Sequence, residues 1–453
     1  MVLLSVISVI TLACSAYLFS KAAGGLSLKR PNILSIFFWI LIIFQYIGSF
    51  LLIAGIVKNN WWINRAENIE SSLRMAHISL MLVLVLLPIT IIFCFKILKF
   101  NPKKETELVY TEDITYIHQN SKDRNVKYIF LLITFLIFLC LVYLLHSVQD
   151  IPIILAVLSS NQELAEITRV SVTRGNFLIK LINGIVGNWI APLLTLALYA
   201  YYWKTKKTFY LLLFVMNFFI TCFFLIYRTE KAPFTLFLIT LFFLYGVLKG
   251  KVNLKKASFL AFIIIGFLSI QYILFLGAGN FENAIEIILS RIFISQHVGS
   301  VLTFDYFPNH EAYLGGKLFL PFSSFLFGEK EVQSFALRIM DYYNPVASSI
   351  GAAGYMSTLF VAEGYANWGW IGIFISILIV GIFLSLCIFF MSRVRQHPIS
   401  LALLSFLSIQ LPFRLNSGLR IAMYSPELIL TIALLISIIV FVRMYPKLKI
   451  RIT

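Results

Sequence analysis

Long apolar runs separated by short polar segments are the dominant pattern of this chain. Most runs are about 18 residues or longer, the length of helix that crosses a hydrocarbon core of about 30 Å. They do not alternate between apolar and polar residues as barrel strands do, and a backbone in lipid must satisfy its own hydrogen bonds. The pattern therefore predicts about eleven membrane-spanning helices, over residues 2–20, 32–57, 75–98, 128–146, 180–203, 208–227, 233–249, 257–277, 370–392, 398–413 and 422–442.

The composition agrees with this pattern. Of the 453 residues, 60% are hydrophobic and 13% are charged, whereas a soluble domain is about half apolar and about a quarter charged. We therefore predict an all-α, polytopic integral membrane protein. It divides into residues 1–277 with spans one to eight, residues 278–369 as a large loop between spans eight and nine, and residues 370–453 with spans nine to eleven and a tail.

The positive charge is distributed unevenly between the two sides. The loops after the odd-numbered spans carry most of the 37 lysine and arginine residues, and they include the charged segment 99–127, which we expect to be a solvated loop. Such loops are retained in the cytoplasm, so we expect the segments 147–179 and 278–369 to face outward. The net charge of +17 follows from this topology, and no soluble domain is present to bind nucleic acid.

The long outward segment begins with an amphipathic pattern. Over residues 281–297, Ile285, Ile288, Leu289 and Ile292 share one helical face, while polar residues including His297 share another. A helix of this kind lies along the membrane surface or packs on the tops of the spans. Several glycine and proline residues follow it and predict loop structure.

Charged residues at the membrane edge are the first candidates for function, because each is costly to place there. Arg228, Glu230 and Lys231 lie in a very short outward turn between two apolar spans. The two cations could bind an anion, or Arg228 could reach the interface beside a local glutamate partner.

Further arginines are expected on the same side. Arg414 and Arg420 flank the top of the last hairpin, Arg291 lies on the amphipathic helix, and Arg169 and Arg174 lie in segment 147–179. The alternative for each is an ordinary solvated or interfacial position. A guanidinium group donates two parallel hydrogen bonds to phosphate, so several converging arginines would suit a pyrophosphate head group on a lipid.

Four residues could transfer protons: Glu363, His310, His297 and Asp341. Glu363 directly precedes a predicted span, where partial burial would suit a general base. Outward aromatic residues such as Tyr365 could stack on sugars or form an interfacial aromatic belt. The sequence has no phosphate-binding glycine loop, zinc-ligand spacing or nucleophile elbow, so we predict neither a cofactor nor a metal.

Three strings resemble one known family. AEGYANWGWIGIFISILIVG (362–381) resembles a motif of the Wzy-type polysaccharide repeat-unit polymerases, the O-antigen and capsule polymerases, in which it leads into a late span. YFPNHEAYLGGKLFLPF (306–322) is similar to the family's large outward loop, and RTEKAPFTLFLITLFF (228–243) to its mid-chain pair of spans. The Arg-then-Gly spacing of some members is not matched after Arg169, Arg174 or Arg291.

The resemblance implies a multi-pass glycosyltransferase of the bacterial inner membrane, active on the outer face. Donor and acceptor would be oligosaccharides on undecaprenyl pyrophosphate, and a flippase and a chain-length regulator would be partners. No metal would be needed, because arginines would stabilise the leaving pyrophosphate. The roles implied are pyrophosphate binding by Arg228, Arg291, Arg414 and Arg420, proton abstraction by Glu363 or else His310, sugar contact by Tyr365, and binding of the second carrier by Arg169, Arg174 and Lys231.

Two alternative functions remain open at this point. An O-antigen ligase uses the same donor with a lipid A core acceptor, and the sequence separates it poorly from a polymerase. A flippase of lipid-linked oligosaccharide is a transporter, which would place charges at the bilayer midplane and often contain inverted repeats. Most charges of this chain lie at span ends, and no repeat is visible.

Overall fold

The fold is known from a computed structural model of the chain. The structure describes residues 2–425 except 58–59, 112–119, 149, 159–167, 169–171, 173–175, 277–278, 318–334, 350–355 and 394–396, together with isolated residues beyond 425.

The described residues form helices of membrane length. Eleven are long and apolar enough to cross a bilayer, which confirms the all-α, polytopic architecture. They are α1 (Val2–Ala23), α2–η1–α3 (Ile33–Leu41, Ile42–Tyr46, Ile47–Ile53), α4 (Ile69–Ile97), α6 (Asn120–Ser147), α9–η3–α10 (Phe177–Leu181, Ile182–Ile190, Ala191–Thr205), α11 (Thr208–Ile226), α12 (Lys231–Leu248), α13 (Leu254–Leu276), α14–η4–α15 (Phe281–Ser290, Arg291–Ser295, Gln296–Tyr306), α19 (Phe360–Arg393) and α20 (Pro398–Leu415).

Shorter helices connect or cover these. They are η2 (Ile63–Arg65), α5 (Pro102–Thr111), α7 (Pro152–Leu158), α17 (Phe335–Tyr343), α18 (Pro345–Ser349) and α21 (Leu419–Met423). The predicted eleventh span, 422–442, lies largely outside the described residues.

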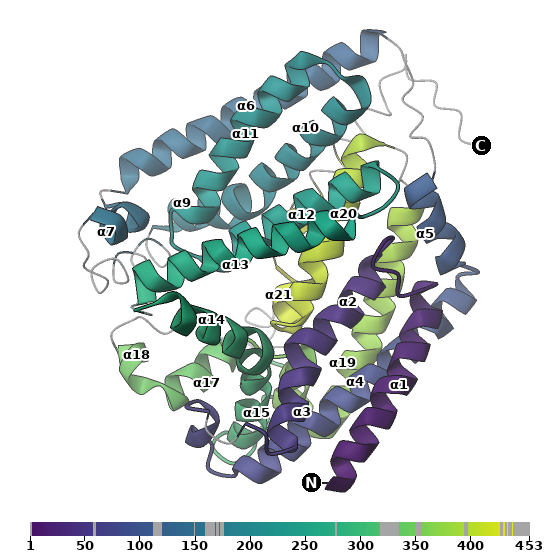
Figure 1. Ribbon diagram of the computed structural model, residues 1–453, viewed down its shortest axis with the longest axis vertical. Helices are drawn as coiled ribbons and strands as arrows, with labels where there is room; N and C mark the ends of the chain where they lie inside the picture. The colour runs from purple at the N-terminus through teal and green to yellow at the C-terminus, as the bar shows by residue number, and fades with distance from the viewer. Residues whose placement is uncertain are drawn as a thin grey trace.

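The bundle has two ends, which we name by their content. At the basic end, α1 and α4 finish, and the Val252 amide donates to the Lys29 carbonyl at 2.8 Å. At the loop end, α4 begins, and the Asn68 amide donates to Asp305 at 2.9 Å. In Figure 1 the loop end lies toward the bottom and left, and the basic end toward the upper right.

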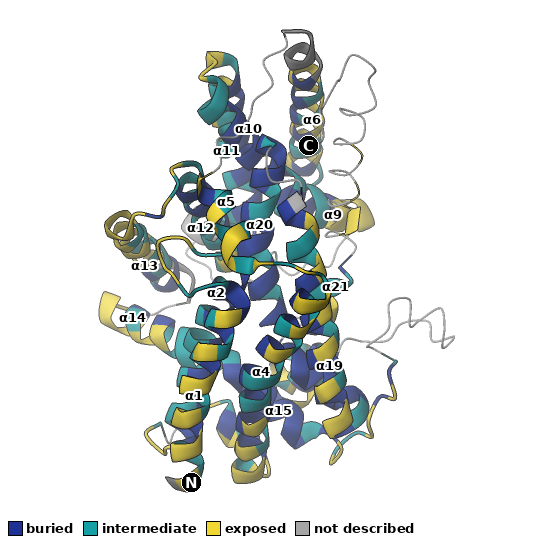
Figure 2. Cartoon of the chain, turned by 90° about the vertical axis from the view of Figure 1, so that its right-hand side faces the viewer, coloured by how far each residue is buried: buried dark blue, intermediate teal, exposed yellow. Residues whose placement is uncertain are grey.

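The helices form two groups with α20 between them (Figure 1). One group contains α1, α2, α4, α15 and α19, and the other contains α6, α10, α11, α12 and α13. Helix α20 packs against α2, α10 and α12 and is the most buried of the membrane-length helices. Figure 2 shows this difference, since α1, α13 and α14 carry many exposed residues and α20 carries few.

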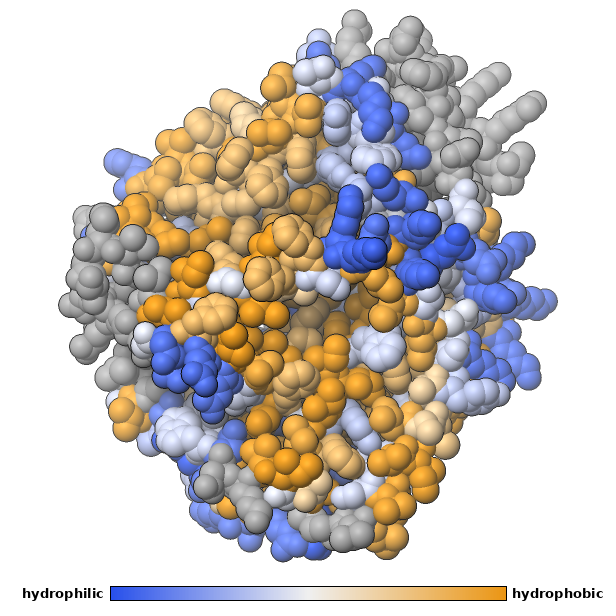
Figure 3. Space-filling model, viewed as in Figure 1, coloured by the Kyte–Doolittle hydropathy of each residue, from blue (hydrophilic) through white to orange (hydrophobic). Residues whose placement is uncertain are grey.

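The surface of the bundle is apolar between its two ends. Figure 3 shows hydrophobic residues across the middle of one face, with hydrophilic residues gathered at the upper right and at the lower left. Exposed side chains on this scale are unfavourable in water but match a hydrocarbon environment. The distribution therefore agrees with a chain that spans a membrane.

Helix α14–η4–α15 is long enough to cross a bilayer, but its two ends lie at the same end of the bundle. Helix α14 packs beside the last turns of α13, and the Arg291 guanidinium lies over the Tyr272 ring. Helix α15 ends beside the start of α4, through Asp305 and Asn68. Because α13 ends and α4 begins at the loop end, this helix enters and returns. We expected residues 281–297 to form an amphipathic helix that lies along the membrane surface or packs on the tops of the spans; the helix forms, but it continues through η4 to Tyr306, and α15 is buried, including His297.

Two other expectations for local structure were wrong. The segment 99–127 is not entirely a solvated loop, because residues 102–111 form α5, which packs on the connection between α1 and α2. Helix α4 begins at Ile69 rather than at residue 75. The carboxylate of Asp305, which is distant in sequence, accepts hydrogen bonds from the amides of Glu67 and Asn68 just before the helix, so the apolar run alone could not indicate where the helix begins.

Helix α19 is broken close to its start. Trp368 and Gly369 leave helical geometry, with Gly369 at φ 60°, and the long straight part begins at Trp370, as predicted for span nine. The short part folds back on the long part at Gly364 and Gly372. A Cβ atom on Gly372 would lie 1.9 Å from the Gly364 carbonyl oxygen, so the contact requires glycine. The broken start places Glu363 inside the bundle rather than on its surface.

Candidate functional site

Arg228 is a buried cation at the loop end. It lies in the turn between α11 and α12 and is 6% exposed. Its Nη2 donates to Asn188 Oδ1 at 3.1 Å and lies 3.0 Å from the Glu230 carboxylate, while its Nε is buried without a partner among the described residues. A buried guanidinium is costly unless its donors are satisfied. The free Nε therefore leaves one strong donor for an additional group.

The turn itself is held rigidly. Thr229 has a left-handed backbone, at φ 59°, and the hydroxyl of Tyr227 donates to Asn183 in η3. Burial raises the pKa of Tyr227 to about 12, although the adjacent Arg228 opposes this rise. Tyr227 therefore remains a neutral hydrogen-bond donor that fixes the position of the turn on η3.

Two further cations meet on one aromatic ring. The Lys231 ammonium lies 3.9 Å from the centre of the Tyr272 ring, and the Arg291 guanidinium lies 5.5 Å from it. Lys231 begins α12, Tyr272 lies in α13 and Arg291 begins η4. Two elements, α12 and η4, thus place positive charge on a ring of α13, and Lys231 follows Arg228 by three residues.

Arg414 approaches the same region from α20. Its guanidinium carbon lies 4.1 Å from the centre of the Trp189 ring, and Nη1 donates to the Ile421 carbonyl at 3.2 Å. Asn188, which holds Arg228, directly precedes Trp189 in η3. This π-helical segment therefore joins Arg228 and Arg414. We call Arg228, Lys231, Arg291 and Arg414 the cation cluster.

Glu363 lies elsewhere at the loop end and is 2% exposed. Its Oε2 accepts a hydrogen bond from the Arg420 amide at 3.0 Å, so it caps the start of α21. Gly418 allows this approach, because a Cβ atom there would lie 3.3 Å from Oε2. The Arg420 side chain is exposed. The described contacts join Glu363 to Arg420 and not to Arg228.

A buried polar network lies one turn away, and the sequence argument missed most of it. Gln45 donates to Asn416 at 2.8 Å and to the Gln296 carbonyl at 3.0 Å, and His297 Nδ1 lies 3.1 Å from Gln45 Oε1. Nearby, His77 Nδ1 lies 2.7 Å from the Ser49 hydroxyl. The signal that could have found them is a polar residue inside an apolar run, as at Gln45 and His77.

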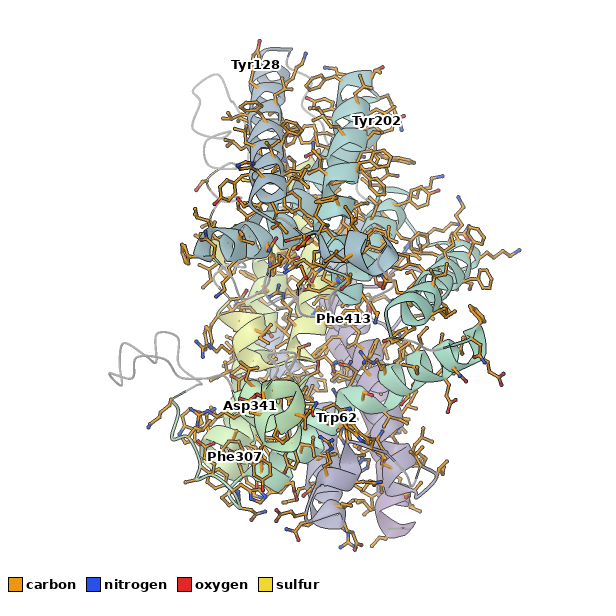
Figure 4. All side chains as sticks on the ribbon, turned by 90° about the vertical axis from the view of Figure 1, so that its left-hand side faces the viewer. Trp62, Tyr128, Tyr202, Phe307, Asp341 and Phe413 are labelled. Atoms are coloured by element: carbon orange, nitrogen blue, oxygen red, sulfur yellow. The ribbon has the colours of Figure 1, made fainter. Side chains whose placement is uncertain are left out.

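His310 belongs to a different cluster, at the end of α15. Its ring lies 3.0 Å from the Tyr342 hydroxyl and 3.6 Å from the Glu67 carboxylate, and Tyr306 packs against both rings. In Figure 4, Phe307 and Asp341 mark this region, well separated from Phe413, which precedes Arg414. His310 and the cation cluster therefore lie apart.

The remaining predicted site residues lie in the protein core, on α17 or outside the described residues. Tyr365 is 3% exposed, its ring centre lies 4.1 Å from that of Phe304, and its hydroxyl accepts from Tyr313 at 3.2 Å. It is a core residue in this structure. Arg169 and Arg174 lie outside the described residues. Asp341 accepts a hydrogen bond from Ser348 on α18.

The arrangement can bind an anion that carries more than one negative charge. Lys231 and Arg291 share the Tyr272 ring, Arg228 and Arg414 contact adjacent residues of η3, and guanidinium groups match phosphate oxygens. Among the described residues, no group of three His, Cys, Asp or Glu side chains is placed to hold a metal ion. Comparison of the chain with protein families, with curated proteins and with solved structures finds no match.

Proposed function

We propose that this protein is a membrane-embedded glycosyltransferase that polymerises oligosaccharide repeat units carried on undecaprenyl pyrophosphate, at the loop end of the bundle and without a metal. The observation that carries the proposal is the cation cluster. Its members come from α12, α20, η4 and the α11–α12 turn: Lys231 and Arg291 share the Tyr272 ring, and Arg228 and Arg414 contact adjacent residues of η3.

The pyrophosphate of the donor would lie on this cluster. In the reaction, an acceptor hydroxyl oxygen bonds to the anomeric carbon of the growing glycan, while the bond from that carbon to the pyrophosphate oxygen breaks. The leaving group gains negative charge, which fixed cations stabilise in a site of low dielectric constant. The buried Nε of Arg228, which has no described partner, is the donor best placed to act on that charge.

The hydroxyl proton needs an acceptor. Glu363 is the candidate that lies within the bundle, beside Arg420, whose exposed side chain could bring substrate phosphate or sugar to it. His310 lies on the aromatic cluster, where Tyr342 and Tyr306 offer faces on which a sugar could stack. We assign Glu363 as the base and the His310 cluster to the glycan.

The test uses purified protein in detergent with the lipid-linked repeat unit extracted from the source cells, in the presence of EDTA. Growth of the glycan in steps of one repeat unit supports the proposal. Strict dependence on a divalent cation contradicts the metal-independent mechanism even if chains grow.

Deletion of the gene separates the neighbouring functions. Loss of a polymerase leaves surface glycan of one repeat unit, whereas loss of a ligase leaves none. A flippase would move the lipid-linked unit across vesicles without forming a covalent product, and that result would overturn the assignment as an enzyme.

A further inference from the structure

A cavity lies at the basic end, at the opposite end of the bundle from the cation cluster. It is enclosed by the end of α1, the starts of α2 and α5, and parts of α4, α12, α19 and α20. Most of its wall is apolar, and the side chains that form this wall include Phe95, Phe100, Val109, Phe243, Ile388 and Leu404. The cavity is therefore suited to a hydrocarbon group rather than to a polar solute.

Helix α5 forms the roof of this cavity and is fixed in place. The Thr106 hydroxyl accepts from Asn32 Nδ2 at 2.8 Å, and the Tyr110 hydroxyl donates to the Pro31 carbonyl at 2.7 Å. The cavity lies where α1 and α4 end and α2 begins, which is the depth of lipid head groups if the bundle spans a bilayer. Its position and its apolar wall both point to a lipid.

Exposed cations lie next to cavity-lining residues in the sequence. Lys29 and Arg30 directly precede the cavity residues Pro31 and Asn32, and Lys103 follows Pro102. Burial raises the pKa of Tyr110, and Arg30 lies close enough to oppose that rise. A Cβ atom on Gly24 would lie 2.4 Å from the Lys103 amide, so the α1–α2 connection and α5 meet at this edge. None of the three cations has a carboxylate partner within the described part of the chain.

One acidic residue also lines the cavity. Glu105 is half-buried in the first turn of α5, and it already takes part in another interaction. The three cations next to the cavity-lining residues outnumber it. The local charge therefore favours an anionic head group over a cationic one.

We infer that this cavity binds part of one acyl chain of an anionic phospholipid, whose phosphate lies on Arg30 and Lys103. The apolar wall takes the chain, and α5 separates it from the polar phase. The site is independent of the proposed glycosyl transfer, because it lies at the opposite end of the bundle. An anionic lipid held here would fix α5 against the α1–α2 connection.

The test is native mass spectrometry of the full chain, taken from nanodiscs of three parts phosphatidylcholine to one part phosphatidylglycerol. We expect phosphatidylglycerol to be enriched on the protein by about fivefold or more over its share of the bilayer. The double variant Arg30→Gln/Lys103→Gln should lose this enrichment. Val109→Trp, which fills the cavity, should lower retention of both lipids.

The matched control removes two exposed cations of the same end that do not adjoin cavity-lining residues in the sequence, as Lys207→Gln/Lys255→Gln. It should retain phosphatidylglycerol as the unmodified protein does. The inference is overturned if the unmodified protein retains no lipid, if the two lipids are retained in proportion to the bilayer, or if the control loses as much enrichment as the test variant. Circular dichroism checks that each variant is folded. If a variant is not folded, the lipid enrichment measured on the unmodified protein alone decides the inference.

Discussion

Positively charged residues occur at both ends of the bundle, but they differ in how deeply they are buried. At the loop end, Arg228 is buried against Asn188 and Glu230, and Arg414 lies over Trp189. At the basic end, Lys29 and Lys103 are exposed. A buried cation must be compensated by fixed partners, whereas an exposed one is compensated by water. Burial and partners, rather than the number of charges, therefore distinguish a candidate anion site from a topology signal.

We expect the largest loss of activity when Glu363, the assigned general base, is substituted. Glu363→Gln keeps the shape of the side chain and an oxygen that can accept from the Arg420 amide, but it cannot take a proton. Glycan polymerisation by the purified variant should fall about 10²- to 10⁴-fold, the usual contribution of general base catalysis. Full activity would assign Glu363 to capping α21 alone. His310→Gln should lower the rate far less.

Arg228→Ala should follow, with a loss of about 10²- to 10³-fold in the polymerisation rate. The reason is that the variant removes the guanidinium whose Nε is available to the leaving pyrophosphate. The control is Arg74→Ala, an exposed cation of the same end whose partner is Glu70. Equal losses in the two variants would mean that burial of Arg228 has no special role.

The contact of Gly48 with η4 at the loop end should tolerate an added methyl group less well than the middle of α13 does. A Cβ atom on Gly48 would lie 1.7 Å from the Phe293 carbonyl, whereas one on Gly266 in α13 would meet nothing within 4 Å. Gly48→Ala should therefore destabilise the protein by about 1–3 kcal/mol. Gly266→Ala should be neutral or slightly stabilising. The thermal unfolding midpoints in one detergent compare them, and similar midpoints would show that α3 and η4 are not packed closely.

The smallest effect is expected at the basic end. Lys255→Ala removes an exposed cation at the start of α13. Polymerisation should stay within about twofold of the unmodified rate, because surface substitutions away from a site change little. A loss of tenfold or more would remove the distinction between the two ends.

The sequence predicted the membrane helices well because apolar length decides them. It predicted Arg228 and Arg414 as candidates because a charge beside an apolar run is conspicuous. It could not predict that Asn188 and Trp189 would join them, because those contacts depend on the π-helical geometry of η3. The sequence predicted a helix from residue 281 on the outward side, but it did not show that this helix continues through η4 into a buried α15.

The buried polar network around Gln45 shows the same limit of prediction from the sequence. Gln45 is visible in the sequence as one amide within an apolar run, but its partners Gln296 and Asn416 lie in segments far along the chain. Periodicity reports which residues share a face, and it contains no information on which faces meet. The sequence therefore gives the candidate site as a set of charged residues. The structure divides these residues into the cation cluster, the Glu363–Arg420 contact and the His310 cluster.

The carboxylate of Asp305 has a consequence for synthesis. It accepts hydrogen bonds from the amides of Glu67 and Asn68, and Asn68 lies 237 residues earlier in the chain. At about 5–20 residues per second, a ribosome needs roughly 10 to 50 seconds to make that interval. Throughout this time the two residues that lead into α4 lack these hydrogen bonds. The early helices must therefore persist in the bilayer in an unfinished state, open to quality control, until the middle of the chain arrives.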